Sequence, residues 1–467
     1  MDTKTIAIVG GGITGLSAAF YLQQMIRNNG LNYKMKLIEA SPRLGGKINT
    51  LKRDGYTIER GPDSLLSRKE SIMKLIDELD LTDEIIHNDT GQSYILINNK
   101  LHKMPTGAYM GVPKQISTLF TLDAVSITGK IRAFGDLVKR RSKMEGQDQS
   151  LGSFIRHRFG NELVDKIIDP LLSGIYSGDL DQMSLMATFP NFYELEQKYG
   201  SLVKGLKNTL PAPNKKAPKN RSGIFISFKD GLETLVHRIS DRLESNTVRL
   251  NTYVDHIEKK DRHYHLLLSS GEVVKAESII MATQHDAIPE MFSQYTFFDT
   301  FNDIPITSSA NVVLSFDQED LKKDIDGTGF LVSKTSDVNI TACTWTHKKW
   351  PTTTPKGKAL VRCYVGRPET PELVDLSDKE LVDLVLKDLK KTMKVKAKPE
   401  FYVVTRWKNS RPQYNVGHLE KISKVREQTK ENLPGVYLAG SSYEGAGIPD
   451  CVAQGKKAAE QAFSYLK

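Results

Sequence analysis

Residues 5–15 read TIAIVGGGITG, and this stretch decides the fold of the first part of the chain. Its apolar start, residues 6–9, is typical of a strand buried on both faces. Three glycines follow in G-x-G-x-x-G spacing, and residues 16–26 carry apolar side chains at helical intervals. A strand, a glycine turn and a helix in this order predict a dinucleotide-binding βαβ unit.

Each glycine of this motif has a physical reason. Gly10 allows the tight turn, Gly12 lets a pyrophosphate approach the backbone, and Gly15 lets the helix pack closely on the strand. The helix N-terminus adds free N–H groups and a partial positive charge for the phosphates. The predicted phosphate-binding loop comprises Gly10, Gly11, Gly12, Ile13, Thr14 and Gly15.

A second predicted strand, residues 35–40, brings Glu39 to its end. A carboxylate at this place accepts hydrogen bonds from a ribose diol and would repel a 2′-phosphate. These residues by themselves therefore predict NAD or FAD as the ligand, and they exclude NADP.

Residues 43–47, RLGGK, place two more glycines and two cations directly after this strand. A plain NAD dehydrogenase does not need a second loop that faces an anion. The R-x-G-G-[RK] pattern resembles the signature of the flavin amine-oxidase-like proteins. The resemblance implies non-covalent FAD as the cofactor, with Ala40 and Lys47 close to it. Lysine keeps the charge that arginine supplies in many members, but it lacks the forked contact.

The end of the chain is predicted to return to the same site. A strand over residues 435–440 precedes a helix whose first residues, with Gly447 before them, can direct N–H groups at an anion or at the flavin ring. Residues 248–283 resemble the middle segment of the same family, in which the residue matching Val254 pairs its backbone with adenine. The cofactor-contacting residues expected here are Val254, Gly447, Ile448 and Pro449.

The chain has 467 residues, a length that predicts two or three domains. Its composition, 39% hydrophobic and 26% charged residues, is typical of a globular enzyme. We expect no signal peptide at the N-terminus, and no apolar run approaches the roughly 20 residues that span a bilayer. The three cysteines are scattered and form no C-x-x-C pair, which predicts no metal site and fits a reducing cytoplasm.

The net charge of +9 is partly clustered, in residues 139–143 and 214–221. Solvated loops, an anionic membrane surface or a polyanionic substrate would each explain these clusters. Nucleic acid is not predicted as a partner, because no aromatic residues interleave the basic ones. No apolar surface helix stands out, and residues 110–122 are only a weak candidate.

We predict an α/β (α+β multidomain) architecture with a two-layer, discontinuous Rossmann-like FAD-binding domain, a sheet-based substrate domain and a helical region. The predicted division assigns residues 1–70, 222–288 and 403–467 to the FAD-binding domain, 71–113 and 289–402 to the substrate domain, and 114–221 to the helical domain. The helical domain is the candidate membrane-facing region.

Three motifs narrow the resemblance: residues 59–64 (ERGPDS), 183–190 (MSLMATFP) and 444–450 (EGAGIPD). They resemble the FAD-dependent porphyrinogen oxidases of haem synthesis, and the match extends over nearly the whole chain. The chain most resembles the Gram-positive bacterial branch, whose substrate is coproporphyrinogen III. The resemblance implies oxidation to coproporphyrin III with O₂ as final acceptor and hydrogen peroxide as product. It also implies a cytoplasmic enzyme with at most peripheral membrane contact and a transient contact with the next pathway enzyme, ferrochelatase.

The same resemblance implies the remaining site residues. Lys69 would hold a propionate, Gly174 and Ile175 together with Leu172 would face the macrocycle, and Tyr364 would orient the substrate or relay a proton. Solvation would equally explain Lys69, and packing would explain the others. The residues expected near the cofactor are Gly61, Pro62, Asp63, Ser64 and Trp407.

Three alternatives stay open at this point. Protoporphyrinogen IX could replace coproporphyrinogen III as the substrate. An amine or polyamine oxidase would share the flavin chemistry, but residues 444–450 replace the aromatic-containing segment typical of those enzymes. A non-catalytic flavin-binding or haem-handling protein would bind the cofactor without being reduced by any porphyrinogen.

Overall fold

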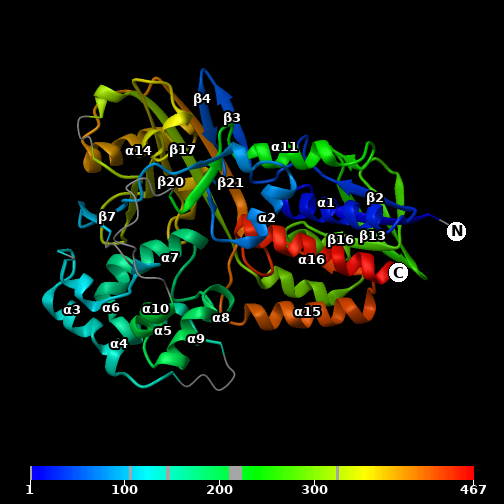
Figure 1. Cartoon of the computed structure of the whole chain (residues 1–467), viewed down its shortest axis with the longest axis horizontal. Helices are drawn as coiled ribbons and strands as arrows, with labels where there is room; N and C mark the ends of the chain where they lie inside the picture. Colours follow the sequence, from blue (N-terminus) through cyan, green and yellow to red (C-terminus); the bar gives the residue numbers. More distant parts are fainter. Residues whose placement is uncertain (1–2, 105–107, 122, 143–147, 210–222, 322–324) are drawn as a thin grey trace. The chain divides into compact units, whose positions relative to one another are not determined.

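The computed structural model describes residues 3–104, 108–121, 123–142, 148–209, 223–321 and 325–467 (Figure 1). The chain forms two compact units. Unit 1 comprises Met1–Ile86, Ile224–Pro305 and Leu419–Lys467, and unit 2 comprises His87–Gly223 and Ile306–His418. The helical segment 114–221 lies within unit 2. The predicted division into three domains stays a prediction. It assigns residues 403–418 to the FAD-binding domain, whereas in the structure these residues belong to unit 2.

Unit 1 is built on a five-stranded parallel sheet with strand order β12-β2-β1-β16-β22. The strands come from the start, the middle and the end of the chain, so the prediction of an α/β, Rossmann-like sheet of discontinuous origin is confirmed. Their bounds are β1 Lys4–Val9, β2 Tyr33–Ile38, β12 Val248–Arg249, β16 Ser278–Met281 and β22 Val436–Leu438.

Alternate residues of β1 enter two different cores. Ile6 and Ile8 join the core formed with the helices, whereas Ala7 and Val9 join a second core on the opposite face. A small antiparallel sheet lies in that second core, so the domain has three layers and the predicted two-layer arrangement is wrong. The covering elements are α1 Ile13–Asn28, α2 Glu70–Glu78, α11 Glu233–Arg242 and α16 Ile448–Leu466 on one face, and β13 Val254–Lys260, β14 His263–Leu268, β15 Val273–Ala276, α12 Ile288–Met291 and α15 His418–Asn432 on the other.

Helices α1 and α16, from the two ends of the chain, lie side by side (Figure 1). Gly455 makes this approach possible, because a Cβ atom there would lie 2.3 Å from the carbonyl oxygen of Thr14. Short strands complete the unit: β3 Thr50–Arg53 pairs with β4 Tyr56–Glu59, and β11 Phe225–Phe228 lies between β5 Leu65–Leu66 and β6 Ile85–His87.

Unit 2 contains a seven-stranded sheet of order β21-β17-β20-β19-β18-β7-β8, antiparallel except between β18 and β7. Helix α14, Asp378–Met393, begins with a capping box between Ser377 and Glu380. The strand bounds are β7 Tyr94–Ile97, β8 Lys100–Lys103, β17 Ile306–Asp317, β18 Gly329–Val332, β19 Ile340–Trp345, β20 Lys358–Val365 and β21 Phe401–Pro412.

The two faces of this sheet differ in chemistry. One face is apolar, and its residues, such as Val312 and Cys363, pack with α14. The other face is polar, because β20 places Arg362 and Tyr364 on it and β17 places Asn311 directly opposite Tyr364. The alternation along each strand therefore separates a core face from a face of buried polar groups.

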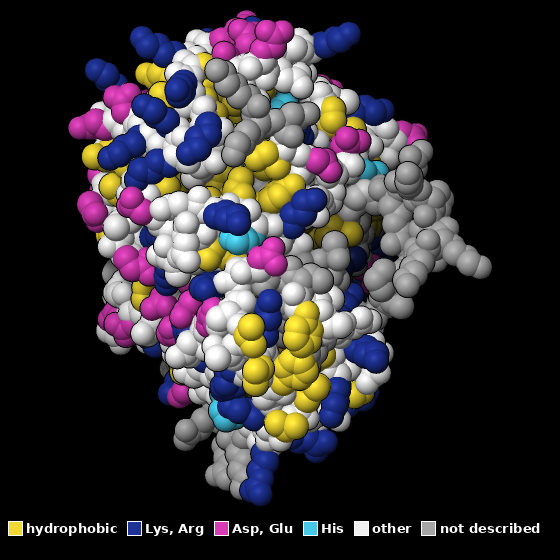
Figure 2. Space-filling view, turned by 90° about the vertical axis from the view of Figure 1, so that its left-hand side faces the viewer, with side chains coloured by type: hydrophobic (Ala, Val, Ile, Leu, Met, Phe, Trp, Pro, Cys, Tyr) yellow, Lys and Arg dark blue, Asp and Glu magenta, His cyan; other side chains and the backbone are white. Residues whose placement is uncertain are grey.

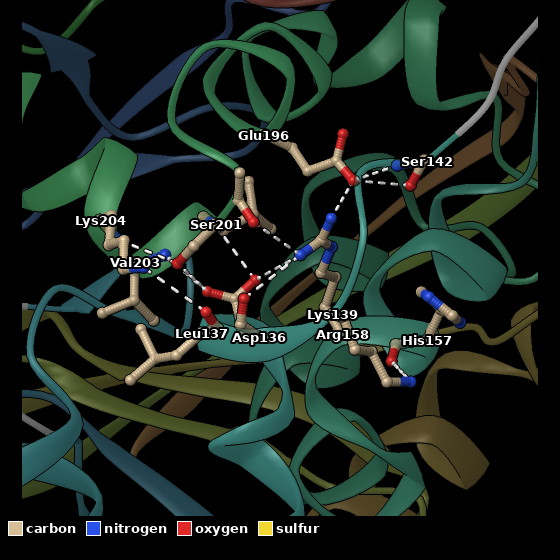
Figure 3. A network of polar contacts seen from close by, with 12 residues as sticks. Asp136, Leu137, Lys139, Ser142, His157, Arg158, Glu196, Ser201, Val203 and Lys204 are labelled. Carbon is tan, nitrogen blue, oxygen red and sulfur yellow. Dashed lines mark hydrogen bonds and ion pairs between the residues drawn. The ribbon is translucent and has the colours of Figure 1, made fainter.

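The helical part of unit 2 is arranged around one fully buried arginine, Arg158 (Figure 3). Its guanidinium forms ion pairs with Asp136 and Glu196, both fully buried. Asp136 also accepts hydrogen bonds from the backbone N–H groups of Leu202 (3.1 Å) and Val203 (2.9 Å) at the start of α10. The helices are α3 Ile127–Ala133, α4 Gly135–Val138, α5 Leu151–Phe159, α6 Asn161–Leu163, α7 Asp169–Tyr176, α8 Leu185–Thr188, α9 Pro190–Tyr199 and α10 Leu202–Thr209.

Candidate functional site

The two glycine loops of unit 1 are joined through their backbones. Gly11 and Gly45 share a hydrogen bond, from the Gly45 N–H to the Gly11 carbonyl, of 2.9 Å. Gly12 and Gly45 form a parallel bridge. Although Gly11 and Gly45 lie 34 residues apart in the sequence, the loop after β1 and the loop after β2 therefore form one surface at the carboxyl ends of the parallel strands, where open α/β sheets bind ligands.

The space around the three motif glycines matches their predicted roles. A Cβ atom on Gly10 would lie 2.8 Å from the carbonyl oxygen of Ala282, and one on Gly15 would lie 1.9 Å from the carbonyl oxygen of Gly10. At Gly12 a Cβ atom would meet nothing within 4 Å. Two glycines thus serve close packing, whereas Gly12 borders open space.

Helix α1 begins directly after Gly12 with no side-chain cap and no acidic residue in its first turn. The N–H groups of that turn, at Ile13, Thr14 and Gly15, are donors that a phosphate can satisfy. Open space at Gly12 and an uncapped helix start together fit a bound pyrophosphate.

Glu39 is held in place by two backbone donors. Its carboxylate accepts from the N–H of Gly11 at 2.6 Å and from the N–H of Ser41 at 2.8 Å. A carboxylate has about four acceptor positions, so capacity for a diol remains. The N–H of Thr252 donates to the carbonyl of Glu39 at 3.0 Å, which brings the start of β13, with Val254, close to Ala40 and the ribose end of the site.

The RLGGK loop uses its two cations differently. Arg43 donates to three carbonyls of its own loop, those of Leu44, Gly46 and Ile48, at 3.1, 2.5 and 2.9 Å. It therefore shapes the loop. Lys47 lies close enough to α16 to influence Cys451. Burial raises the pKa of the Cys451 thiol to about 11, and the positive charge of Lys47 partly opposes this increase.

Helix α16 presents a second uncapped start in unit 1. Gly447 is its N-cap residue without a side-chain bond, and Ile448 and Pro449 begin the helix. Asp450, in its first turn, forms an ion pair of 3.0 Å with Lys69. Lys69, predicted to hold a propionate, is thus already neutralised in this structure, and an incoming carboxylate would have to compete with Asp450.

The segment between β4 and β5 carries Gly61, Pro62, Asp63 and Ser64, and the Ser64 hydroxyl donates to Asp63 at 2.9 Å. β5, which follows directly, contacts α16. These four residues therefore lie in unit 1 with the glycine loops.

Unit 2 contains the predicted substrate residues. In α7, Ile175 is 46% exposed, and a Cβ atom on Gly174 would meet only Leu331, at 4.0 Å, so both are accessible. Leu172 instead lies fully buried in the helical core, where packing explains it. Tyr364 lies on the polar face of the sheet, and the guanidinium carbon of Arg362 is 4.9 Å from the centre of its ring.

Comparison with known proteins shows the family to which the chain belongs. The family model described as flavin containing amine oxidoreductase matches residues 13–462. The chain belongs to this flavin-containing amine oxidoreductase family. It is 46% identical to the coproporphyrinogen III oxidase of Bacillus subtilis (strain 168), over 99% of this chain and 98% of that protein.

Two further relatives narrow the position within the family. The coproporphyrinogen III oxidase of Staphylococcus aureus (strain NCTC 8325 / PS 47) is 42% identical over 99% of this chain and 100% of that protein. A crystal structure from Exiguobacterium sp. 255-15, named as a candidate protoporphyrinogen oxidase, is 37% identical with a TM-score of 0.89 and covers 100% of this chain and 99% of that one. The predicted resemblance to the porphyrinogen oxidases is confirmed.

The protein is therefore an oxidoreductase whose family carries a flavin, and its residues fit one. The joined glycine loops, the open space at Gly12 and the oriented carboxylate of Glu39 are the features that a flavin dinucleotide requires. Trp407 lies on β21 of unit 2, opposite Ser309, and its contact with the flavin stays a prediction.

Three roles at these sites were not predicted, and one of them belongs to Arg43, which the sequence had indicated only as a cation in a loop that faces an anion. Gly455 permits the contact of α16 with α1, and Arg43 shapes the second loop. Arg411, near the end of β21, donates to the carbonyl of Ile175 at 3.4 Å. A small residue within a helix could have indicated the role of Gly455, and a charge within a tight loop could have indicated that of Arg43. The position of Arg411 depends on strand pairing that no local pattern encodes.

Proposed function

We propose that this protein oxidises coproporphyrinogen III to coproporphyrin III, with non-covalently bound FAD as hydride acceptor and O₂ as final acceptor. The observation that carries the proposal is the joined pair of glycine loops with Glu39 at their edge, in a chain that is 46% identical to a coproporphyrinogen III oxidase over its full length. We assign the protein to the cytoplasm and its product to ferrochelatase, the next enzyme of haem synthesis, through transient contact.

The residues of unit 1 have separate tasks in this proposal. The first turn of α1 holds the pyrophosphate, and Glu39 holds the ribose diol. Bound flavin would supply the redox chemistry, accepting a hydride equivalent from a methylene bridge and passing electrons to O₂ to form hydrogen peroxide. Lys47, near the start of α16, adds positive charge beside the cofactor.

The state of Cys451 supports non-covalent binding. Burial raises the pKa of this thiol to about 11, so it remains protonated at neutral pH. A protonated, buried thiol is a poor nucleophile. Acid precipitation of the protein is therefore expected to release the yellow colour into the supernatant.

Unit 2 supplies the surfaces that suit a flat tetrapyrrole. Ile175 offers an accessible apolar contact, and Gly174 leaves room beside it. Tyr364 presents a phenol from the polar face of the sheet, where it can orient a pyrrole N–H or receive its proton.

The decisive experiment is anaerobic bleaching of the flavin with a panel of reduced substrates. We expect coproporphyrinogen III to bleach the holoenzyme faster than protoporphyrinogen IX, with putrescine inactive, and readmitted air to yield peroxide. Faster bleaching by protoporphyrinogen IX, as the name of the Exiguobacterium relative suggests, would overturn the substrate assignment. Bleaching by the amine, or by none of the three, would overturn the porphyrinogen oxidase assignment.

We also propose that unit 2 contacts an anionic membrane surface peripherally. Ile127, Ile131 and Val138 lie at spacings of four and seven residues along α3 and α4, and they are 77%, 64% and 84% exposed. Such spacings place side chains on one helical face. Phe120, also exposed, touches Phe134 between the two helices, with ring centres 5.8 Å apart. The apolar surface lies mostly beyond residues 110–122, the weak candidate for an apolar surface helix, but within residues 114–221, the candidate membrane-facing region.

Charge complementarity favours an anionic membrane as the partner of this apolar stripe, which we define as Phe120, Ile127, Ile131 and Val138. Between positions 120 and 142, Asp123 is the one exposed acidic residue among those described, and the other exposed charged residues are basic, because Asp136 is fully buried in the Arg158 network. Figure 2 shows a face on which apolar side chains gather among lysines and arginines. The second predicted basic cluster, residues 214–221, lies outside the described residues. An apolar stripe with basic flanks is typical of interfacial binding.

Within the part of the chain that the structure describes, no helix combines the length and the apolar character needed to cross a bilayer. The stripe can be tested by co-sedimentation with vesicles. We expect binding to vesicles that contain phosphatidylglycerol and not to pure phosphatidylcholine, and we expect Ile131→Ser to abolish it. Tyr402→Ser, at an exposed site on β21, is the matched control. Equal binding by the two variants would contradict the assignment.

A further inference from the structure

Arg411 interacts with two of the predicted substrate residues of unit 2, Ile175 and Tyr364. It lies near the end of β21, opposite Thr307 on β17. Its Nη1 donates to the carbonyl of Ile175, in the last turn of α7, at 3.4 Å. Its backbone carbonyl accepts from the Gln413 amide at 3.0 Å, so the strand end is held in place. Arg411 as a whole residue is only partly exposed.

The charges around Arg411 are unusual for a half-buried cation. Burial lowers the pKa of Arg411, the phenol of Tyr364 opposes this effect, and the positive charge of Arg362 lowers the pKa further. Among the described residues, no carboxylate forms an ion pair with Arg411. Buried cations are normally paired, because desolvation without an opposite charge is costly.

Other arginines of unit 2 show the usual arrangement. Arg406, on the same strand, pairs with Asp378 at 2.5 Å. Burial also lowers the pKa of Arg367, but the charges of Glu369 and Asp169 oppose that effect. The absence of an acidic partner is therefore specific to Arg411 among these three.

We propose that Arg411, together with Arg362 beside the Tyr364 ring, binds a carboxylate of the substrate. The inference rests on the proposed function, and the ligand it names is one propionate of the tetrapyrrole. One edge of the guanidinium is directed to Ile175, and Nε and Nη2 make no hydrogen bond to any described residue, so they can bind a carboxylate in a forked geometry. Ile175 and Gly174 then border the apolar ring while the arginines hold its charged rim.

A purely structural role is the competing explanation, since a cation at the C-terminus of α7 interacts favourably with the helix dipole. The two roles predict different results. A structural arginine would affect the stability of the fold, and lysine would largely replace it. A carboxylate-binding arginine would affect the affinity for charged porphyrins, and lysine would replace it poorly because it lacks the fork.

The test measures binding of coproporphyrin III, the product, to the holoenzyme through the shift of its Soret absorption. We compare wild type, Arg411→Gln, Arg411→Lys and the control Lys408→Gln, which removes an exposed cation of the same strand. We expect Arg411→Gln to weaken binding about 10- to 100-fold, as loss of a charge-assisted pair does. Arg411→Lys should fall in between, Lys408→Gln should match wild type, and the thermal midpoints should agree.

The tetraamide of coproporphyrin III, which keeps the ring without the charges, completes the experiment. We expect Arg411→Gln to bind it as wild type does. Undiminished affinity of Arg411→Gln for coproporphyrin III, or an equal loss for the acid and the amide, would overturn the inference and leave the oxidase assignment intact. A wild-type enzyme that neither binds coproporphyrin III nor is bleached by coproporphyrinogen III would overturn both.

Discussion

Two arginines of unit 2, Arg158 and Arg411, show how the surroundings of one residue type decide its role. Arg158 is fully buried between Asp136 and Glu196 (Figure 3). Arg411 is partly exposed, and besides burial its pKa is influenced by the phenol of Tyr364, which raises it, and by a second cation, Arg362, which lowers it. A cation neutralised inside the fold stabilises the fold, whereas a cation held without an anion is prepared for a ligand. The following experiments test this distinction.

The largest effect is expected for Arg158→Met. The substitution leaves two carboxylates buried without their cation, and breaking such a pair costs about 3–5 kcal/mol. Urea unfolding of the holoenzyme should show this loss, while the flavin spectrum of the folded fraction stays unchanged. Arg27→Met, at an exposed pair with Glu244, is the control and should lose far less. A loss below about 1 kcal/mol for Arg158→Met would contradict the structural role of the network.

Carboxylates allow the same comparison in unit 1. Glu39 and Glu277 both accept a backbone N–H, from Gly11 and from Thr5, each at 2.6 Å, but they lie at opposite ends of β1. Glu39→Ala should weaken FAD binding by about 1.5–3 kcal/mol, since a charged acceptor is lost from the ribose. Fluorescence titration of the apoprotein with FAD measures this. Glu277→Ala should retain wild-type affinity, and equal losses in the two variants would refute the ribose assignment.

A smaller, pH-dependent effect is expected at Glu162, which joins the start of α3 to α6. Burial raises its pKa, but hydrogen bonds from Lys166 and Ser126 outweigh burial and lower the pKa to about 2. Because the folded pKa lies below the ordinary value, the contribution to stability is complete above about pH 4.5 and is lost as the pH falls toward 2.

The measurement is urea unfolding of wild type and Glu162→Gln across this pH range. The side chain is partly exposed, so we expect wild type to exceed the variant by about 1 kcal/mol near neutral pH. The difference should shrink as the pH falls. A difference that is constant with pH would show that ionisation of Glu162 is not its source.

The smallest effect is expected on the surface of α15. Lys424 and Glu420 form an ion pair of 2.6 Å, and both side chains are 70% exposed. Water screens such a pair, so Lys424→Ala should leave the unfolding midpoint within experimental error. A clear decrease would mean that exposed pairs matter more in this protein than the comparison of Arg158 with Arg411 assumes.

Local patterns predicted the residues whose task is set by backbone conformation. The G-x-G-x-x-G turn, the uncapped helix after it and Glu39 at the next strand end all follow from neighbours in sequence. Family resemblance added Tyr364 and Ile175, whose contacts with substrate stay predictions.

The sequence by itself thus determined the βαβ unit, the cofactor class and the family of this protein, because these depend on residues within a few turns of one another. Only the tertiary structure decided that unit 1 has a third layer, that Asp450 neutralises Lys69, and that Arg411 donates a hydrogen bond to Ile175. The charge state and accessibility of a side chain depend on which distant segments lie beside it. Sequence spacing does not encode the pairing of β21 with β17 that places Arg411, which forms no ion pair with a carboxylate among the described residues, beside Ile175.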